Sequence, residues 1–180
     1  MEGGNGMDLG PSDKVKPILE QVKAFIDNEI LPVEREYHEE VDKGDRWQYT
    51  ERQTEILEDL KKKARAKNLW NFFLTHWEGG YGLNTVEYSY IAEETGRSHL
   101  APEVFNCSAP DTGNMEVLAR YCSDEQKKKW LVPLLNGEIR SAYAMTEPGV
   151  ASSDAKNISM SCVLDGNEWV LNGEKIWISG

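Results

Sequence analysis

Two kinds of hydrophobic pattern divide this sequence, and their order is its strongest constraint on the fold. Up to about residue 138, apolar side chains recur at the three- and four-residue spacing of amphipathic helices. Further on, short alternating runs are separated by Asp165-Gly166 and Asn172-Gly173, dipeptides that are typical of tight hairpin turns. Helices followed by strands predict an α+β protein with segregated parts, rather than a wound βαβ fold.

The same patterns predict three parts of the chain. Residues 1–11 are expected to be a disordered lead, residues 12–138 an N-terminal all-α helical domain, and residues 139–180 the first strands of an antiparallel β domain.

Capping residues predict where the helices begin. Ser12 is expected to cap a long helix that ends near Lys43, and Pro32 must kink or divide it. Thr50 is expected to cap a second helix. Two further helices are predicted, one from Thr85 to Thr95, stopped by Gly96, and one from the capping box Ser123-x-x-Gln126 to Leu135, with Gly137 at its end.

Charge and hydropathy exclude several functions. With 31 acidic and 20 basic residues, the chain has a formal net charge of −11, so it has no basic field with which to bind nucleic acid. No apolar run approaches the ~18–20 residues that a membrane helix needs. The acidic, glycine-rich opening does not resemble a signal peptide. We therefore expect a soluble intracellular protein with no membrane span.

Neither cysteine nor histidine spacing predicts a metal site. The cysteines fit no disulfide or zinc pattern and are expected to be reduced and buried: Cys107, Cys122 and Cys162. The histidines are expected to be isolated: His38, His76 and His99. An aromatic cluster between Leu69 and Leu83 fits a core under a loop better than a pocket lining; it comprises Trp70, Phe72, Phe73, Trp77 and Tyr81.

The run from Tyr143 to Asp154, YAMTEPGVASSD, is unusual for plain scaffold. Ser141 to Met145 alternates as a strand does, and Glu147-Pro148-Gly149 interrupts it at a turn. The small and hydroxylated residues that follow let a backbone approach a bulky ligand and offer donors to carbonyl or phosphate oxygens. An ordinary strand before a serine-rich loop would have the same letters, so this run alone leaves both interpretations open.

Residues 158–179, ISMSCVLDGNEWVLNGEKIWIS, predict a three-stranded antiparallel meander. Trp177 and Ser179 would share one face of its last strand, because strand side chains repeat every two residues. An indole beside a hydroxyl suits the isoalloxazine ring of a flavin. An aromatic strand that faces a core is the alternative.

Together, TEPGVASSD and NGEKIWIS resemble the flavin-binding signature of the acyl-CoA dehydrogenase family. The segments from Tyr81 to Ser98, from Ala109 to Tyr121 and from Ser123 to Glu138 are similar to helical segments of that family. The phrases APDTGNMEVL and MTEPGVASSDAKNI are most similar to family members ten and eleven. In most of the family the loop after Pro-Gly runs straight into Gly-Ser-Asp, whereas here it is one residue longer.

The resemblance implies FAD as cofactor and assigns residues to it. Thr146 would bond the pyrimidine carbonyls, Ser152 would meet the pyrophosphate, and Ser179 would reach the ring nitrogen that accepts hydride. Trp177 would pack on the ring edge, and Ser153 would face both FAD and acyl-CoA. The full cofactor-binding set is Tyr143, Ala144, Met145, Thr146, Ser152, Ser153, Trp177, Ile178 and Ser179.

The resemblance also implies an activity and partners. The family oxidises acyl-CoA to trans-2-enoyl-CoA in fatty acid β-oxidation and passes electrons to an electron-transfer flavoprotein or to oxygen. Its catalytic base lies in a C-terminal helical bundle that has no counterpart here, so no catalytic residue is assigned and the chain alone is expected to be inactive. A homodimer or homotetramer is expected at full length, in the cytoplasm, mitochondrion or peroxisome. The alternative is a truncated, non-catalytic helical module for interaction or dimerisation.

Overall fold

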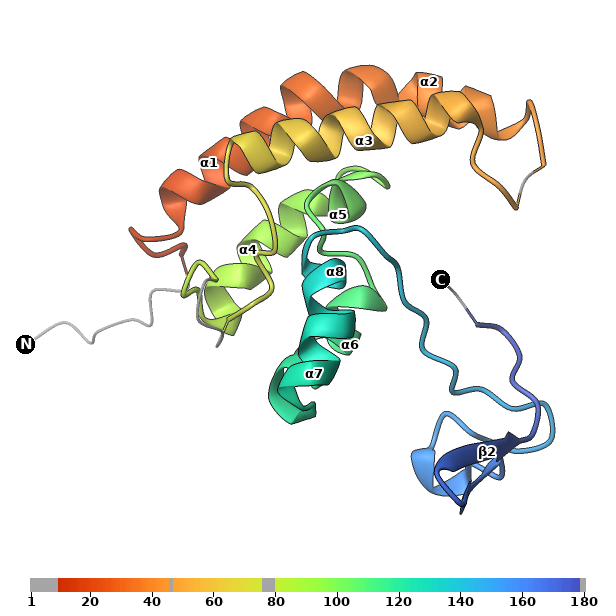
Figure 1. Ribbon diagram of the computed structural model, residues 1–180. Helices are drawn as coiled ribbons and strands as arrows, with labels where there is room; N and C mark the ends of the chain where they lie inside the picture. The colour runs from red at the N-terminus through yellow and green to blue at the C-terminus, as the bar shows by residue number, and fades with distance from the viewer. Residues whose placement is uncertain (1–9, 46, 76–79, 179–180) are drawn as a thin grey trace, which may run out of the picture. The chain divides into compact units, whose positions relative to one another are not determined.

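The computed structural model describes residues 10–45, 47–75 and 80–178 (Figure 1). Helices come first and a short antiparallel strand pair comes last, which confirms the predicted α+β class with segregated parts. The chain forms two compact units, residues 1–108 and 109–180. The predicted domain boundary after residue 138 stays a prediction, and most of the predicted disordered lead lies outside the described residues.

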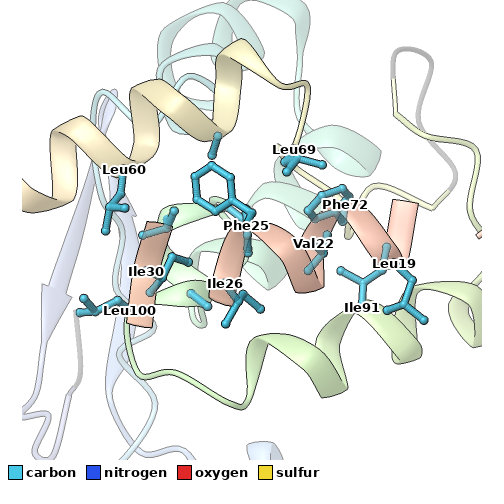
Figure 2. Close-up of a cluster of buried hydrophobic side chains, with 14 of the residues drawn as sticks. Leu19, Val22, Phe25, Ile26, Ile30, Leu60, Leu69, Phe72, Ile91 and Leu100 are labelled. Carbon is cyan, nitrogen blue, oxygen red and sulfur yellow. The ribbon is translucent and has the colours of Figure 1, made fainter. Parts of the chain in front are cut away.

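Unit 1 is a helical unit around one apolar core. Its elements are α1 (Lys16–Phe25), the π-helical turn η1 (Ile26–Ile30), α2 (Leu31–Val41), α3 (Glu51–Ala66), α4 (Thr85–Thr95) and α5 (Ala101–Val104). Side chains from α1, η1, α3 and α4 point toward one another in this core (Figure 2). Burying a side chain the size of Phe or Leu stabilises a fold by about 1.5–3 kcal/mol, so this cluster holds the unit together.

The aromatic cluster belongs to the core of unit 1. Phe72 is fully buried, with its ring centroid 4.9 Å from that of Tyr81 and 5.7 Å from that of Phe105. Phe73 is buried as well. The core interpretation is therefore confirmed for these residues, while Trp77 lies outside the described residues.

Pro32 and Pro133 each follow a π-helical turn within a continuous helical segment. Pro32 is preceded by η1, where the Leu31 N–H bonds the Ile26 carbonyl, and Pro133 by η2 (Lys127–Leu131), where the Val132 N–H bonds the Lys127 carbonyl. A proline has no N–H, and its ring crowds the carbonyl four residues back. Widening the preceding turn relieves that clash, so the helix continues across Pro32 instead of ending there.

Side-chain capping explains where α3, α4 and α7 begin. Thr50 and Ser123 form reciprocal capping boxes with Gln53 and Gln126, as predicted. Ser12 does not cap α1 directly, because α1 begins at Lys16 and Pro17 occupies its first turn. The Ser12 hydroxyl oxygen accepts the Val15 N–H at 3.4 Å, just ahead of α1, and the hydroxyl donates to a carboxylate oxygen of Glu87 at 2.6 Å.

Unit 2 contains helices followed by a hairpin. Its elements are α6 (Asp111–Tyr121), α7 (Asp124–Gln126), η2, α8 (Val132–Leu135), the 3₁₀ turn η3 (Ala155–Asn157), β1 (Ser161–Asp165) and β2 (Glu168–Asn172). Gly137, with φ +64°, ends α8, and its N–H donates to the Leu134 carbonyl.

The strand pair has the predicted position but a different turn. Asp165 pairs with Glu168, so the two loop residues are Gly166 and Asn167, and only Gly166 has a positive φ. A positive φ at the first loop residue alone fits a type II′ turn, so the loop lies one residue later than the Asp165-Gly166 dipeptide that the sequence indicated.

Two strand predictions are wrong within the described residues. No strand is assigned over 141–147 or 175–178, and the sheet has only β1 and β2. Trp177 has φ +58°, which is incompatible with extended pairing. A strand also needs a continuous ladder of backbone hydrogen bonds, and the described residues 141–147 and 175–178 are joined by one backbone bond, from the Ile176 N–H to the Thr146 carbonyl.

Histidine and cysteine positions correct two further expectations. The rings of His38 and His99 lie 5.9 Å apart in an edge-to-face arrangement, so these histidines are not isolated from each other. Cys162 is exposed on β1, Cys107 and Cys122 are half-buried, and all three cysteines are free thiols. In the described part of the chain, no helix is long and apolar enough to cross a membrane, and no cluster of three metal-ligating side chains occurs.

Candidate functional site

The two sequence segments singled out above lie side by side in unit 2. The Ile176 N–H donates to the Thr146 carbonyl at 2.9 Å. The Lys175 ammonium donates to the Met145 carbonyl, also at 2.9 Å. Residues 145 and 146 of the YAMTE run therefore contact residues 175 and 176, through backbone and lysine rather than through a regular strand pair.

Glu147 is the centre of this contact. Its carboxylate is buried and accepts hydrogen bonds from the Ser159 N–H, the Ser159 hydroxyl, the Met160 N–H and the Lys175 ammonium, at 2.6–2.9 Å. Each carboxylate oxygen receives two donors, so the buried charge is fully compensated. One side chain thus connects residue 147 to the lead into β1 and to residue 175.

The donors around Glu147 fix its protonation state. The Ser159 hydroxyl, the Lys175 ammonium and the Ser159 N–H lower the pKa of Glu147 to about 2, because hydrogen bonds and positive charge stabilise the ionised carboxylate. Glu147 is therefore an anion at neutral pH and forms an ion pair with Lys175, with 2.9 Å between the nitrogen and the nearer oxygen.

The serine-rich turn is folded back onto the same residue. The Ser152 hydroxyl oxygen accepts the Glu147 N–H at 2.5 Å, and Ser152 is only 1% exposed. The Ser152 N–H bonds the Val150 carbonyl, and the Asp154 N–H bonds the Ala151 carbonyl. Ser152 thus stabilises the turn from inside, while Ser153 lies exposed at its surface.

The start of α6 holds the segment just before the site. The buried Asp111 carboxylate accepts bonds from Arg140 Nε at 2.5 Å, the Ser141 N–H at 2.7 Å and the Ser141 hydroxyl at 2.6 Å. Asn114 donates its amide to the same hydroxyl and to the Ala142 carbonyl. Residues 140–142 are therefore fixed to α6, so the chain enters the YAMTE run from a defined position.

The predicted cofactor residues occupy three kinds of position. Met145 and Thr146 are half-buried at the contact with residues 175 and 176. Tyr143 and Trp177 expose 61% and 86% of their surface. Ala144, Ser153 and Ile178 are also exposed, Ser152 is buried, and Ser179 lies outside the described residues.

Sequence reasoning missed the residues that organise the site. Glu147 was interpreted only as part of a turn, and Lys175 and Asp111 had no assigned role. The sequence did contain a signal for this pairing: Glu147 places one carboxylate in the YAMTE run, and Lys175 places one ammonium in the NGEKIWIS motif. Opposite charges in two segments that otherwise resemble buried strands predict pairing, because an unpaired buried charge is unfavourable.

An apolar groove of about 330 Å³ lies on the helical part of unit 2. Its wall is mainly aliphatic and aromatic, and Arg140 and Ser141 are among its polar lining residues. The remaining lining residues are Asn114, Val117, Leu118, Trp130, Leu134 and Ile139.

Comparison with known proteins identifies relatives of this chain. The sequence profile of the acyl-CoA dehydrogenase N-terminal domain matches residues 12–138. The chain is 46% identical to acyl-CoA dehydrogenase family member 10 of Mus musculus over 99% of its own length, and 48% identical to family member 11 of Homo sapiens over 93%. A solved putative acyl-CoA dehydrogenase from Mycobacterium abscessus is 49% identical, with a TM-score of 0.82 over 95% of this chain.

The relatives are much longer than this chain. It spans 17% and 21% of the two curated relatives and 43% of the mycobacterial structure. A Bacillus anthracis acyl-CoA dehydrogenase, solved in complex with FAD, is 30% identical with a TM-score of 0.60. The profile match ends at residue 138, so the predicted flavin residues, 143–179, lie outside it.

Proposed function

The chain belongs to the acyl-CoA dehydrogenase family, and from this membership we propose that it is the N-terminal part of a FAD-dependent acyl-CoA dehydrogenase. The whole enzyme would convert acyl-CoA to trans-2-enoyl-CoA in β-oxidation. The observation that supports this most is the bond from the Ile176 N–H to the Thr146 carbonyl, because it joins the two segments that resemble the flavin signature.

The side chains at this contact fit a flat ring with polar edges. Trp177 is 86% exposed, and its backbone is in the left-handed region. This conformation costs free energy in a residue other than glycine, and such residues cluster at ligand sites. Tyr143 is exposed on the neighbouring segment. An indole and a phenol can pack on an aromatic ring and contribute about 1 kcal/mol beyond area burial.

FAD, when bound, would supply the hydride-accepting chemistry. Thr146 would donate its hydroxyl to a carbonyl of the ring, and Trp177 would exclude water from the ring edge. Ser153, exposed at the turn, would contact both FAD and acyl-CoA. Ser152 would support this turn from inside, because it is 1% exposed and its hydroxyl oxygen accepts the Glu147 N–H; its contact with the pyrophosphate stays a prediction.

The partners follow from family membership. We propose acyl-CoA as substrate, an electron-transfer flavoprotein or oxygen as electron acceptor, and a homodimer or homotetramer at full length. The compartment would be the cytoplasm or the matrix of a mitochondrion or peroxisome. No residue of this chain is assigned as the catalytic base.

A titration of the purified chain with FAD tests the cofactor assignment. We expect quenching of flavin fluorescence and a shifted visible spectrum, both lost in Trp177→Ala. Trp169→Ala is the matched control, because Trp169 is also exposed, at 65%, but lies on the hairpin away from the contact. A chain that leaves the FAD spectrum unchanged, or equal losses in the two variants, would contradict the proposal.

One observation favours the interaction module as a second candidate. Val163 pairs with Val170 on one face of the hairpin and Leu164 with Trp169 on the other, and all four are exposed. A hairpin with two apolar faces is stable only when covered. Under this alternative the chain would self-associate without FAD, and Leu164→Ser with Trp169→Ser would restore a monomer in sedimentation experiments.

A further inference from the structure

The Lys175 ammonium makes two different bonds at the contact between the flavin-signature segments. It donates to the Glu147 carboxylate and to the Met145 carbonyl, each at 2.9 Å. The side chains of Lys175 and Glu147 are only 15% and 4% exposed. The ammonium is therefore held by a charge from one side and by a peptide dipole from the other.

An ion pair in this position is an unfavourable choice for stability alone. Removing both charges from water offsets much of their attraction, and apolar residues of similar size are often at least as stabilising. A purely structural contact between two extended segments could be made by aliphatic side chains. The pair does, however, fix direction, because each partner must point at its specific acceptors.

The bond to Met145 has an electrostatic consequence for its peptide. A cation on the Met145 carbonyl polarises the amide that links Met145 to Thr146, and hydrogen bonds in a chain strengthen one another in a low dielectric. The N–H at the other end of that amide belongs to Thr146. The ammonium thus makes the backbone N–H of Thr146 a better hydrogen-bond donor.

We propose that Lys175 and Glu147 are the positioning pair of the flavin site: they hold residues 175–177 against residues 145–147, and the balance of their charges sets the potential felt by the bound ring. This inference rests on the proposed flavin binding. It assigns a role to two residues that do not themselves touch the ring.

The reduction potential of bound FAD separates this role from simple scaffolding. Lys175→Met leaves the Glu147 anion uncompensated, which disfavours the electron-rich reduced flavin, so the potential should fall. Glu147→Gln leaves the ammonium uncompensated, so the potential should rise. Opposite shifts are expected although both variants break the same ion pair. A scaffold role alone would move both potentials in the same direction or leave both unchanged.

Affinity and controls complete the experiment. Lys175→Met should also weaken FAD binding by about tenfold, comparable to the loss of one charge-assisted hydrogen bond, whereas Lys175→Arg should retain the wild-type potential. Lys156→Met is the matched control, because Lys156 is an exposed cation of the same unit and its removal should change neither quantity. If Lys175→Met does not fold, the Glu147→Gln variant alone tests the inference: a raised reduction potential supports it, and a lowered or unchanged potential overturns it.

The outcomes distinguish this inference from the function on which it rests. If the wild-type chain binds no FAD, the proposed function fails and the inference with it. If the wild type binds FAD but the two variants shift its potential in the same direction or not at all, the flavin assignment stands and the positioning role is overturned.

Discussion

Lys175 and Glu147, 28 residues apart in the sequence, form an ion pair of 2.9 Å that joins the two motifs of the candidate site. The carboxylate also holds the Ser159 and Met160 amides at the lead into β1. The contact around Glu147 in unit 2 is therefore polar, whereas the core of unit 1 is apolar. The stability of this contact should accordingly depend on pH.

Stability of unit 2 should depend on the ionisation of Glu147. Its pKa is lowered from 4.5 to about 2, so ionised Glu147 stabilises the folded state above its unfolded pKa, and that contribution is lost as the pH falls from 4.5 toward 2. Glu147→Gln should remove this part of the acid transition. Acid titrations followed by circular dichroism, with Glu174→Gln as an exposed control, test it; identical curves for all three proteins would contradict the assignment.

The capping box at Thr50 should contribute measurably to unit 1. Thr50→Ala removes the acceptor of the Gln53 N–H and should lower the free energy of unfolding by about 1 kcal/mol. Thr54→Ala, in the exposed interior of the same helix, should have little effect, because its hydroxyl only bonds back to the Thr50 carbonyl. Urea unfolding measures both, and equal effects would count against the cap.

Phe72 should behave as a core residue rather than as a pocket lining. Phe72→Ala removes the ring between Tyr81 and Phe105 and should lower the free energy of unfolding by about 3–5 kcal/mol. Trp47→Ala, an exposed aromatic of the same unit, is the control and should be nearly neutral. A Phe72→Ala protein with wild-type stability would show that the ring is not needed by the core.

Thiol reactivity should separate the cysteines. Cys162 is exposed on β1 and should react quickly with a thiol reagent at pH 8. Burial raises the pKa of the Cys107 thiol to about 11, so its thiolate fraction is very small and it should react only on unfolding. Mass spectrometry after timed labelling distinguishes the sites, and faster labelling at Cys107 than at Cys162 would contradict the structure.

The anchor at Asp111 should order the entrance to the site. Asp111→Asn weakens the bonds to Arg140 and Ser141, so exchange of the Ser141 amide, which donates to this carboxylate, should accelerate. A loss of about 1–3 kcal/mol in protection is expected for bonds to a buried charge. Asp124→Asn, at an exposed helix start, should leave the Ser141 amide unchanged; protection unaffected by Asp111→Asn would rule out the anchor.

Local rules predicted the parts of the fold that depend on neighbouring residues. The capping boxes at Thr50 and Ser123 and the hairpin between Asp165 and Glu168 require only short-range bonds, so spacing and turn chemistry suffice to find them. The π-turns before the prolines were missed, because the sequence predicts a disturbance at proline but not how the preceding turn absorbs it.

Long-range pairing explains what the sequence could not predict. Alternation indicated a third strand at residues 175–179, but it carries no information about the φ of Trp177 or about the acceptor of the Ile176 N–H. The role of Glu147 depends on residues up to 28 positions away. Similarly, the proximity of His38 and His99 arises from the packing of separate elements, which residue spacing does not contain.

Hydrogen exchange at the Ile176 amide, measured in the free chain and with FAD, tests the central claim most directly. We predict that this amide is protected in the free chain by its bond to the Thr146 carbonyl and that FAD slows its exchange further, because the ring covers both segments. Exchange at the rate of an unprotected peptide, with no response to FAD, would contradict the joined segments and the flavin site together.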